Sequence, residues 1–161
     1  MPSLTGKRVL VLGAETPDGR SLAPVLAVAG AQLALVAANP DAESAFAVQR
    51  LARRLNAVSQ AIDAANETAV RVMLRQVSKQ LGGLDAIVFC AEPLHLPHAL
   101  ALGSKELARS GSRTFVAVVS PGAAGVVTPP GIDLHTVTGS GDPQQTAAAV
   151  LACIAGPADN R

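Results

Sequence analysis

The sequence predicts an α/β protein built on one parallel β-sheet, in a single domain that spans residues 1–161. Three observations support this fold class. Apolar segments of strand length alternate with helical patterns along the whole chain, an order typical of parallel sheets. The first apolar segment, residues 9–12, runs directly into a turn with a glycine at each end, Gly13 and Gly19. A chain of 161 residues, 49% of them hydrophobic, is also long enough to build one core.

The first strand and the first helix follow directly from this pattern. Residues 7–12 form the strand, and a helix is expected at residues 20–29. Gly30 ends this helix, and Pro24, which lacks a backbone N–H, either delays its start or bends it. The second strand, residues 32–37, is again an apolar run.

Two amphipathic helices flank a weaker third strand. Asn39 is suited to an N-cap and Pro40 to the first helical position, so a helix is expected to begin there. After the strand at residues 57–62, Asn66 caps another helix, which Gly82 ends by adopting a left-handed conformation. Their apolar faces repeat at intervals of three and four residues: Val48, Leu51, Ala52 and Leu55 on the first, and Val70, Leu74, Val77 and Leu81 on the second.

Prolines and glycines punctuate the second half of the chain. Pro93 and Pro97 separate the fourth strand, the second-clearest of all, from the next helix. Asp142 begins the last helix, with Pro143 at its first position and Gln145 in its first turn. The elements expected here are a strand at 84–90, a helix at 97–110, a strand at 113–120, a loop at 121–131, a strand at 132–137 and a helix from 142 to about 154.

Composition and charge exclude several classes of function. The net charge is only +1 and no basic run occurs, so nucleic acid is not an expected partner. No apolar run approaches the length of a membrane span, and the stretch after Lys7 and Arg8 ends at Glu15, too early for a signal peptide. Cys90 and Cys153 are expected to be reduced thiols. We therefore expect a cytoplasmic protein that binds neither nucleic acid nor membranes.

Several motifs occur in one order along the chain. The strand, glycine turn and helix over residues 9–20 have the phosphate-cradling geometry of a Rossmann unit. The other motifs are Leu4-Thr5-Gly6-Lys7 before the first strand, Ile62-Asp63, Leu84-Asp85-Ala86-Ile87-Val88, Gly131-Ile132-Asp133-Leu134-His135-Thr136-Val137, and the helix at 144–155. In this order they resemble the short-chain dehydrogenase/reductase family over residues 4–120 and 131–156. The resemblance implies a doubly wound, Rossmann-like sheet of about six strands, in the order 3-2-1-4-5-6.

The same resemblance implies a nicotinamide dinucleotide, NAD or NADP, as cofactor. Residues 37–39, at the end of the second strand, contain neither the acid that binds an adenosine 2′-hydroxyl nor the arginine that binds a 2′-phosphate, so the preference between the two is not predicted. The positions that match the family's cofactor contacts are Gly13, Glu15, Thr16, Asp18 and Gly19 in the turn, Asn39 after the second strand, Asp63 beside the adenine, and Ala91 after the fourth strand.

The chain departs from the family where the family's chemistry takes place. It contains no tyrosine, and the helix with the Tyr-x-x-x-Lys motif is missing. Pro17 replaces the middle glycine of the turn and has no N–H for a phosphate, while Asp18 would repel phosphates if its carboxylate points inward. Gly122 takes the place of the catalytic serine, with Ser120 nearby. We therefore expect dinucleotide binding to be weak or absent.

The sequence assigns no residue a catalytic role, but Ser120, His95 and His98 are candidates. All three are expected near the carboxyl edge of the sheet, where α/β proteins bind ligands, and histidine exchanges protons near neutral pH. Glu92 and the two histidines are also metal-ligand types, but two prolines break the helix that would give them a common face, so no metal is expected. Cys90, at the same edge, is interpreted as a structural cysteine.

Three functions follow as alternatives. The preferred one is a family member without standard catalysis, acting as a binding or regulatory module. The second is an active oxidoreductase with a rearranged site, in which His95, His98, Cys90 or Ser120 donates the proton. The third is a structural subunit, since loss of two outer helices would expose a sheet face that a homo-oligomer or another protein partner would bury.

Overall fold

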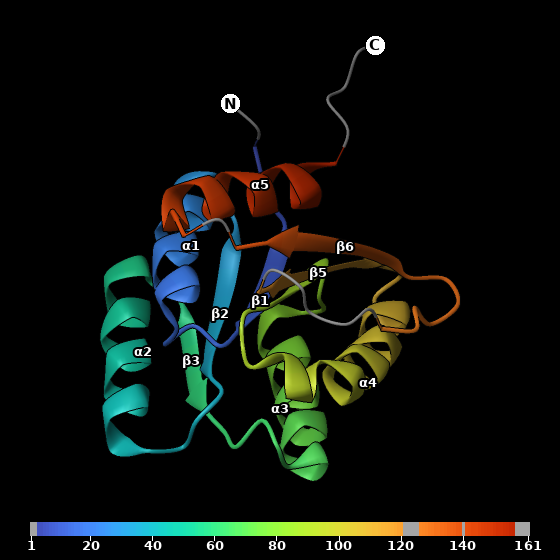
Figure 1. Ribbon diagram of the computed structural model, residues 1–161, viewed down its shortest axis with the longest axis horizontal. Coiled ribbons are helices and arrows are strands. Elements are labelled where there is room, and N and C mark those ends of the chain that lie inside the picture. The colour runs from blue at the N-terminus through green and yellow to red at the C-terminus, as the bar shows by residue number, and fades with distance from the viewer. Residues whose placement is uncertain (1–2, 121–125, 140, 157–161) are drawn as a thin grey trace.

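The computed structural model describes residues 3–120, 126–139 and 141–156, and these residues fold around one sheet of six parallel strands (Figure 1). The order of the strands is β3-β2-β1-β4-β5-β6. This confirms the doubly wound topology and the strand order expected from the sequence. The strands are β1 Arg8–Leu12, β2 Gln32–Ala37, β3 Val58–Ala61, β4 Ala86–Phe89, β5 Thr114–Val119 and β6 Asp133–Thr138.

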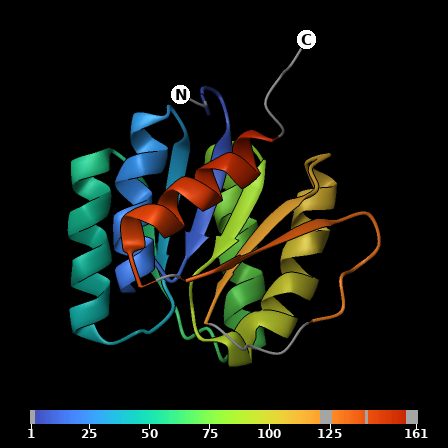
Figure 2. The ribbon, with the colours of Figure 1, turned by 45° about the horizontal axis from the view of Figure 1, so that its top comes forward.

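Helices cover both faces of the sheet (Figure 2). On one face lie α1 (Pro17–Val28), α2 (Ala42–Leu55) and α5 (Pro143–Ala155), and on the other lie α3 (Glu67–Leu81) and α4 (Leu96–Arg109), with the short 3-10 helix η1 (Pro93–His95) leading into α4. Among the described residues, no helix combines the length and the apolar character needed to cross a membrane.

The core consists of two apolar layers, one on each face of the sheet. Along β1, Val9 and Val11 face the layer under α1, α2 and α5, while Leu10 and Leu12 face the layer under α3 and α4. All four side chains are buried because the strand is covered on both faces. This explains why the central strands are continuous apolar runs and not alternating ones.

The first helix begins earlier than the sequence analysis expected. It starts at Pro17, not near residue 20, because Thr16 serves as its N-cap: Thr16 Oγ1 accepts a hydrogen bond from the Gly19 N–H at 3.1 Å. Pro17 is suited to the first helical position, where a backbone N–H has no partner within the helix. Pro24 therefore lies inside α1 and does not delay its start.

The second helix begins later than expected. Its N-cap is Asp41, whose Oδ1 accepts the Ser44 N–H at 2.9 Å, and its first residue is Ala42. The expected cap, Asn39, uses its side chain elsewhere, since its amide donates to Glu15. By contrast, the expected caps of α3 and α5 are confirmed, because Asn66 accepts the Ala69 N–H and Asp142 accepts the Gln144 N–H.

The large apolar sheet face expected from the loss of two outer helices is not found among the described residues. Helix α4 is 14 residues long and packs over β4 and β5. Within the described ranges, the edge strand β6 is the one without a helix on that face, where Thr136 and Thr138 are exposed and Leu134 is half-buried. This argument for an oligomer therefore loses its structural basis, while oligomer formation itself stays a prediction.

Arg8 and Asp85 join the amino ends of β1 and β4. Oδ2 of Asp85 accepts hydrogen bonds from the Arg8 backbone N–H at 2.8 Å and from Arg8 Nε at 2.9 Å. Arg8 Nη1 also donates to the carbonyl oxygen of Gly82, the residue that ends α3. The hydrogen bonds from Arg8 hold the pKa of Asp85 below its ordinary value, although burial acts in the opposite direction.

Because its pKa is lower in the folded protein than in the unfolded chain, ionised Asp85 stabilises the fold above about pH 4, and this contribution is lost as the pH falls through the folded-state pKa. We expect Asp85→Asn to lower the free energy of unfolding by about 1–3 kcal/mol at pH 7 and by less at pH 3, as measured by urea denaturation. The matched control is Asp133→Asn, which removes an exposed ion pair with Arg113 and is expected to cost less than about 1 kcal/mol. Equal losses for the two variants at pH 7 would contradict the prediction.

Candidate functional site

The glycine turn lies between β1 and α1, against the end of β4. Gly13 has a positive φ of 96°, and a Cβ atom built on it would lie 2.7 Å from the backbone nitrogen of Ala91 and 2.8 Å from the carbonyl carbon of Cys90. A Cβ atom on Gly19 would overlap the carbonyl oxygen of Gly13. Both glycines are therefore required by close backbone approach, whether or not a ligand binds.

The first turn of α1 offers few donors to an anion. Pro17 has no N–H, and the N–H of Gly19 is taken by Thr16 Oγ1. The Thr16 hydroxyl in turn donates to the carbonyl oxygen of Gly13 at 2.7 Å, so this side chain is used within the turn. Of the first three helical residues, only Asp18 keeps a backbone N–H without a partner among the described residues. Where a helix N-terminus binds phosphate, it does so through several free backbone N–H groups.

A cavity of about 350 Å³ opens at the carboxyl edge of the sheet, beside this turn. Its size falls in the range of small-molecule sites. Asp18 lines it, and one of its carboxylate oxygens lies 3.6 Å from the position that a Cβ atom on Gly139 would take. The Asp18 carboxylate thus points inward, in the orientation that repels phosphate. The described residues that line the cavity are Pro17, Asp18, Cys90, Ala91, Pro93, Val118, Val119, Ser120, Gly139, Gly141 and Pro143.

Cys90 lines this cavity but is not poised as a nucleophile. Its side chain is buried, and burial raises the pKa of its thiol strongly, with further increases from the negative charges of Asp18 and Glu15. The thiol therefore stays protonated at neutral pH, whereas a nucleophilic cysteine needs a lowered pKa. This agrees with the interpretation of Cys90 as a structural residue.

The Glu15 side chain reaches from the turn to the carboxyl end of β2. Both of its carboxylate oxygens lie 3.0 Å from the backbone nitrogen of Ala38. Oε2 also accepts the Asn39 backbone N–H at 3.1 Å and the Asn39 side-chain amide at 3.0 Å. A carboxylate therefore stands at the strand end where Rossmann units hold the adenosine ribose. Glu15 was expected among the cofactor contacts, but its hydrogen bonds to Ala38 and Asn39 were not predicted. The available signal was an acid in the turn combined with no acid at residues 37–39.

Two further candidate contacts lie near the turn. Asp63 is exposed at the end of β3, and its Oδ1 accepts the Ala65 N–H at 3.0 Å, so its side chain stabilises a local turn. Ala91 is buried, and its backbone packs against Gly13. These positions are consistent with the expected binding residues, but each also has a purely structural explanation, and their cofactor role stays a prediction.

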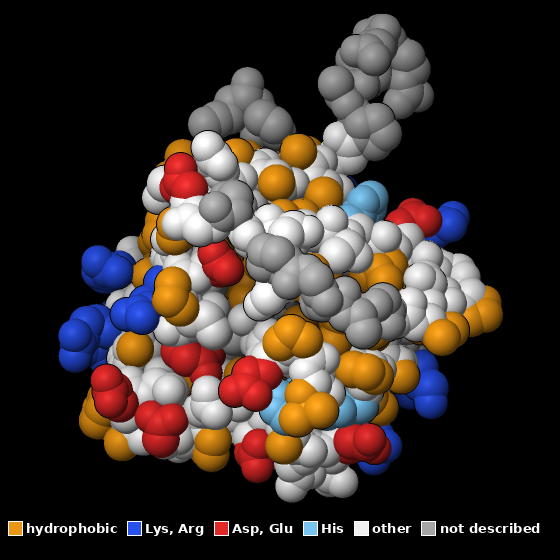
Figure 3. Space-filling view, viewed as in Figure 1, with side chains coloured by type: hydrophobic (Ala, Val, Ile, Leu, Met, Phe, Trp, Pro, Cys, Tyr) orange, Lys and Arg blue, Asp and Glu red, His pale blue; other side chains and the backbone are white. Residues whose placement is uncertain are grey.

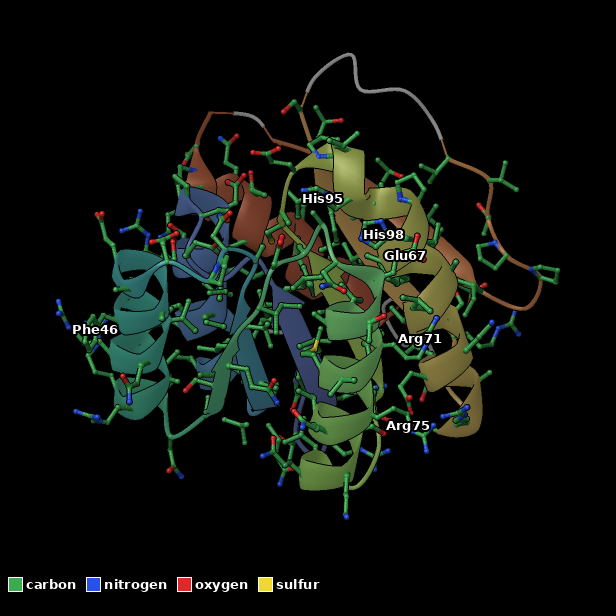
Figure 4. All side chains as sticks on the ribbon, turned by 90° about the horizontal axis from the view of Figure 1, so that it is seen from below. Phe46, Glu67, Arg71, Arg75, His95 and His98 are labelled. Carbon is green, nitrogen blue, oxygen red and sulfur yellow. The ribbon has the colours of Figure 1, made fainter. Side chains whose placement is uncertain are left out.

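The candidate proton donors are separated by the fold. Ser120 lines the cavity, whereas neither His95 nor His98 is among the described residues around it. The two rings stack at a tilt, with centroids 5.8 Å apart, and His98 Nε2 lies 2.6 Å from the carbonyl oxygen of Ala64. Figure 4 shows both histidines beside the first turn of α3, where Glu67 lies. Among the described residues, Ser120 is therefore the one candidate donor of these three that lines the cavity, and the catalytic role of all three stays a prediction. Gly122 lies outside the described residues.

No three metal-ligating side chains come together within the ranges that the structure describes. Glu92, which the sequence analysis weighed as a ligand beside the two histidines, is exposed just before η1. One ring nitrogen of His98 is already at hydrogen-bond distance from Ala64.

Several acidic residues lie at helix N-termini, along the carboxyl edge of the sheet. All helices begin near the carboxyl edge, because each returns antiparallel to its strand, and acidic residues favour helix N-termini. In the space-filling view, most acidic side chains lie in the lower half of the visible face, and basic ones lie at its left and right margins (Figure 3). No lysine or arginine is among the described residues that line the 350 Å³ cavity. In the described α-helices, the acidic residues at N-caps or in first turns are Asp18, Asp41, Glu43, Glu67 and Asp142.

The strand order, the glycine turn and the cavity at the carboxyl edge define a Rossmann-type fold, and solved structures of short-chain dehydrogenases share it. A dehydrogenase/reductase from Sinorhizobium meliloti 1021 superimposes with a TM-score of 0.72 at 20% identity, covering 96% of this chain and 90% of that one. A short-chain dehydrogenase from Burkholderia cenocepacia J2315, in complex with NADP, gives a TM-score of 0.66 at 22% identity, with 96% and 92% coverage.

A third similar structure is carveol dehydrogenase from Mycobacterium avium in complex with NAD, with a TM-score of 0.59 and 19% identity, over 74% of this chain and 56% of that one. No protein-family model and no curated protein matches the sequence. At these identities the likeness shows the fold, which is the fold that the glycine turn and the strand pattern predicted.

Proposed function

We propose that this chain is a dinucleotide-binding domain of the short-chain dehydrogenase/reductase type that lacks the family's tyrosine-dependent hydride transfer and acts as a binding or regulatory module. The observation that carries the proposal is the cavity at the carboxyl edge. It lies beside a turn that keeps its first and last glycines, yet the polar side chains among its described lining are only Asp18, Cys90 and Ser120. None of these replaces the tyrosine and lysine of the family, and the chain contains no tyrosine.

The adenosine half of a dinucleotide fits this site better than the pyrophosphate half. At the end of β2, Glu15 offers a carboxylate to a ribose hydroxyl, and the turn keeps the glycines that let a backbone approach a ligand. At the start of α1, Pro17 removes one donor and Asp18 adds a negative charge. A hydrogen bond to a charged group contributes about 1.5–3 kcal/mol, so the loss of even one such bond weakens binding at least about tenfold. This supports weak binding.

The experiment that tests the proposal is a calorimetric titration with NAD⁺, NADH, NADP⁺ and NADPH, followed by a spectroscopic assay for hydride transfer to carbonyl compounds. We expect at least one dinucleotide to bind, and no turnover above the uncatalysed rate. Turnover at a rate typical of enzymes, about 1–1000 s⁻¹, would contradict the loss of catalysis. No binding at millimolar ligand would contradict the dinucleotide part and would direct attention to protein partners.

A further inference from the structure

The Glu15 carboxylate fills an anion-binding position at the carboxyl end of β2. The successive backbone N–H groups of Ala38 and Asn39 converge on it, together with the side-chain amide of Asn39. Converging donors of this kind bind the oxygens of a carboxylate or a phosphate. Here the chain itself supplies the anion, so a ligand anion at this position would have to displace Glu15 or lie beside it.

The adenosine ribose of a dinucleotide meets a Rossmann unit at this strand end. A phosphate on the ribose 2′-oxygen would therefore bring additional negative charge next to the Glu15 carboxylate. Among the described residues, none of the ion pairs includes Glu15, so no lysine or arginine directly neutralises its carboxylate. Like charges within a few ångströms of each other disfavour binding, and more strongly where the site is partly desolvated.

A free 2′-hydroxyl meets the opposite situation, because it can donate to the carboxylate. Oε2 of Glu15 already accepts three hydrogen bonds, whereas Oε1 shares only the Ala38 N–H. An ionised carboxylate has about two acceptor positions on each oxygen, so Oε1 keeps one for a hydroxyl group. In many Rossmann units an acidic residue at the end of β2 accepts a hydrogen bond from the ribose 2′-hydroxyl. Glu15 offers a carboxylate oxygen at the same place from the glycine turn.

We infer that Glu15 makes the site selective for an adenine dinucleotide with a free 2′-hydroxyl, NAD, over the 2′-phosphorylated form, NADP. This inference rests on the proposed function, since it assumes that a dinucleotide binds. The residue that determines this selectivity lies in the glycine turn. It is not one of the three residues at the end of β2, Ala37, Ala38 and Asn39, where Rossmann units usually carry it.

The test is a calorimetric titration of the wild-type and Glu15→Gln proteins with NAD⁺ and NADP⁺ at one ionic strength. We expect the wild-type protein to bind NAD⁺ at least about tenfold more tightly than NADP⁺. Glutamine keeps an acceptor oxygen for Ala38 and Asn39 but loses the charge, so NADP⁺ affinity should rise at least about tenfold while NAD⁺ affinity changes less. The matched control is Asp133→Asn, which removes one negative charge at the opposite edge of the sheet and should keep the wild-type ratio.

Equal wild-type affinity for the two dinucleotides, or a ratio that Glu15→Gln leaves unchanged, would overturn the inference while leaving the proposed function intact. No binding of either dinucleotide to either protein would overturn the proposed function and this inference together. Circular dichroism checks that each variant is folded. Glu15→Ser, which removes the carboxylate and the length of the side chain, is the second variant, and it too should bind NADP⁺ more tightly than the wild-type protein does.

Discussion

Gly13→Ala is expected to destabilise the protein by at least about 3 kcal/mol, the largest effect of any single substitution considered for this chain. Two costs combine at this position. The backbone has a φ of 96°, which an L-residue with a Cβ atom rarely adopts. The new methyl group would also lie 2.7 Å from the nitrogen of Ala91, a backbone atom that cannot move without displacing the end of β4.

The matched control separates these two costs. Gly111 also has a positive φ, of 73°, but a Cβ atom there would meet nothing within 4 Å. Gly111→Ala should therefore lose only about 1 kcal/mol from the backbone conformation. Both values can be measured by urea denaturation at pH 7. Similar losses for the two variants would mean that the end of β4 can yield, and that the turn is not held by its contact with Ala91.

Asp18→Asn is expected to strengthen dinucleotide binding at least about tenfold. The substitution removes the negative charge that points into the cavity and keeps the backbone N–H at the start of α1. Calorimetric titration with NADH at low and high salt measures the effect. Because salt screens charges, the difference between variant and wild type should shrink as the ionic strength rises.

Asp133→Asn again serves as the control, since it makes the same change of charge at the amino edge of the sheet. An NADH affinity that is the same in Asp18→Asn as in the wild type, at both salt concentrations, would show that this carboxylate does not face the pyrophosphate. The variant should also lose about 0.3–1 kcal/mol of stability, because Asp18 lies in the first turn of α1 and interacts favourably with the helix dipole.

The same residue therefore acts in opposite directions on folding and on binding. An acid at the second position of a helix stabilises that helix, whereas the corresponding position at a phosphate site favours a neutral residue that leaves the N–H groups open. With Pro17 before it and Thr16 as the cap, the start of α1 has the features of a well-capped helix. These features indicate that the turn is better suited to stabilising the start of α1 than to binding phosphate strongly.

The sequence by itself determined the class of the fold and most of its elements. Buried strands are recognised by continuous apolar runs, and buried helix faces by apolar residues spaced three and four apart, such as Val70, Leu74 and Val77. Both patterns can be read from the sequence because they depend on burial alone. The caps Asn66 and Asp142 were also predictable, because each bonds a backbone N–H only two or three residues away. Local rules are sufficient wherever the interacting groups are close in sequence.

Only the tertiary structure decided what the candidate site contains. Glu15 and Ala38 are 23 residues apart, and their contact exists because β1 and β2 are neighbours in the sheet. That contact also removed Asn39 from the N-cap of α2, where the local pattern had placed it. Likewise, the Asp18 carboxylate faces a cavity whose walls come from the ends of β4, β5 and β6. The direction in which Glu15 or Asp18 points could not be predicted from the sequence. It depends on strands that are distant along the chain and pack beside the turn, and not on the neighbouring residues in the sequence.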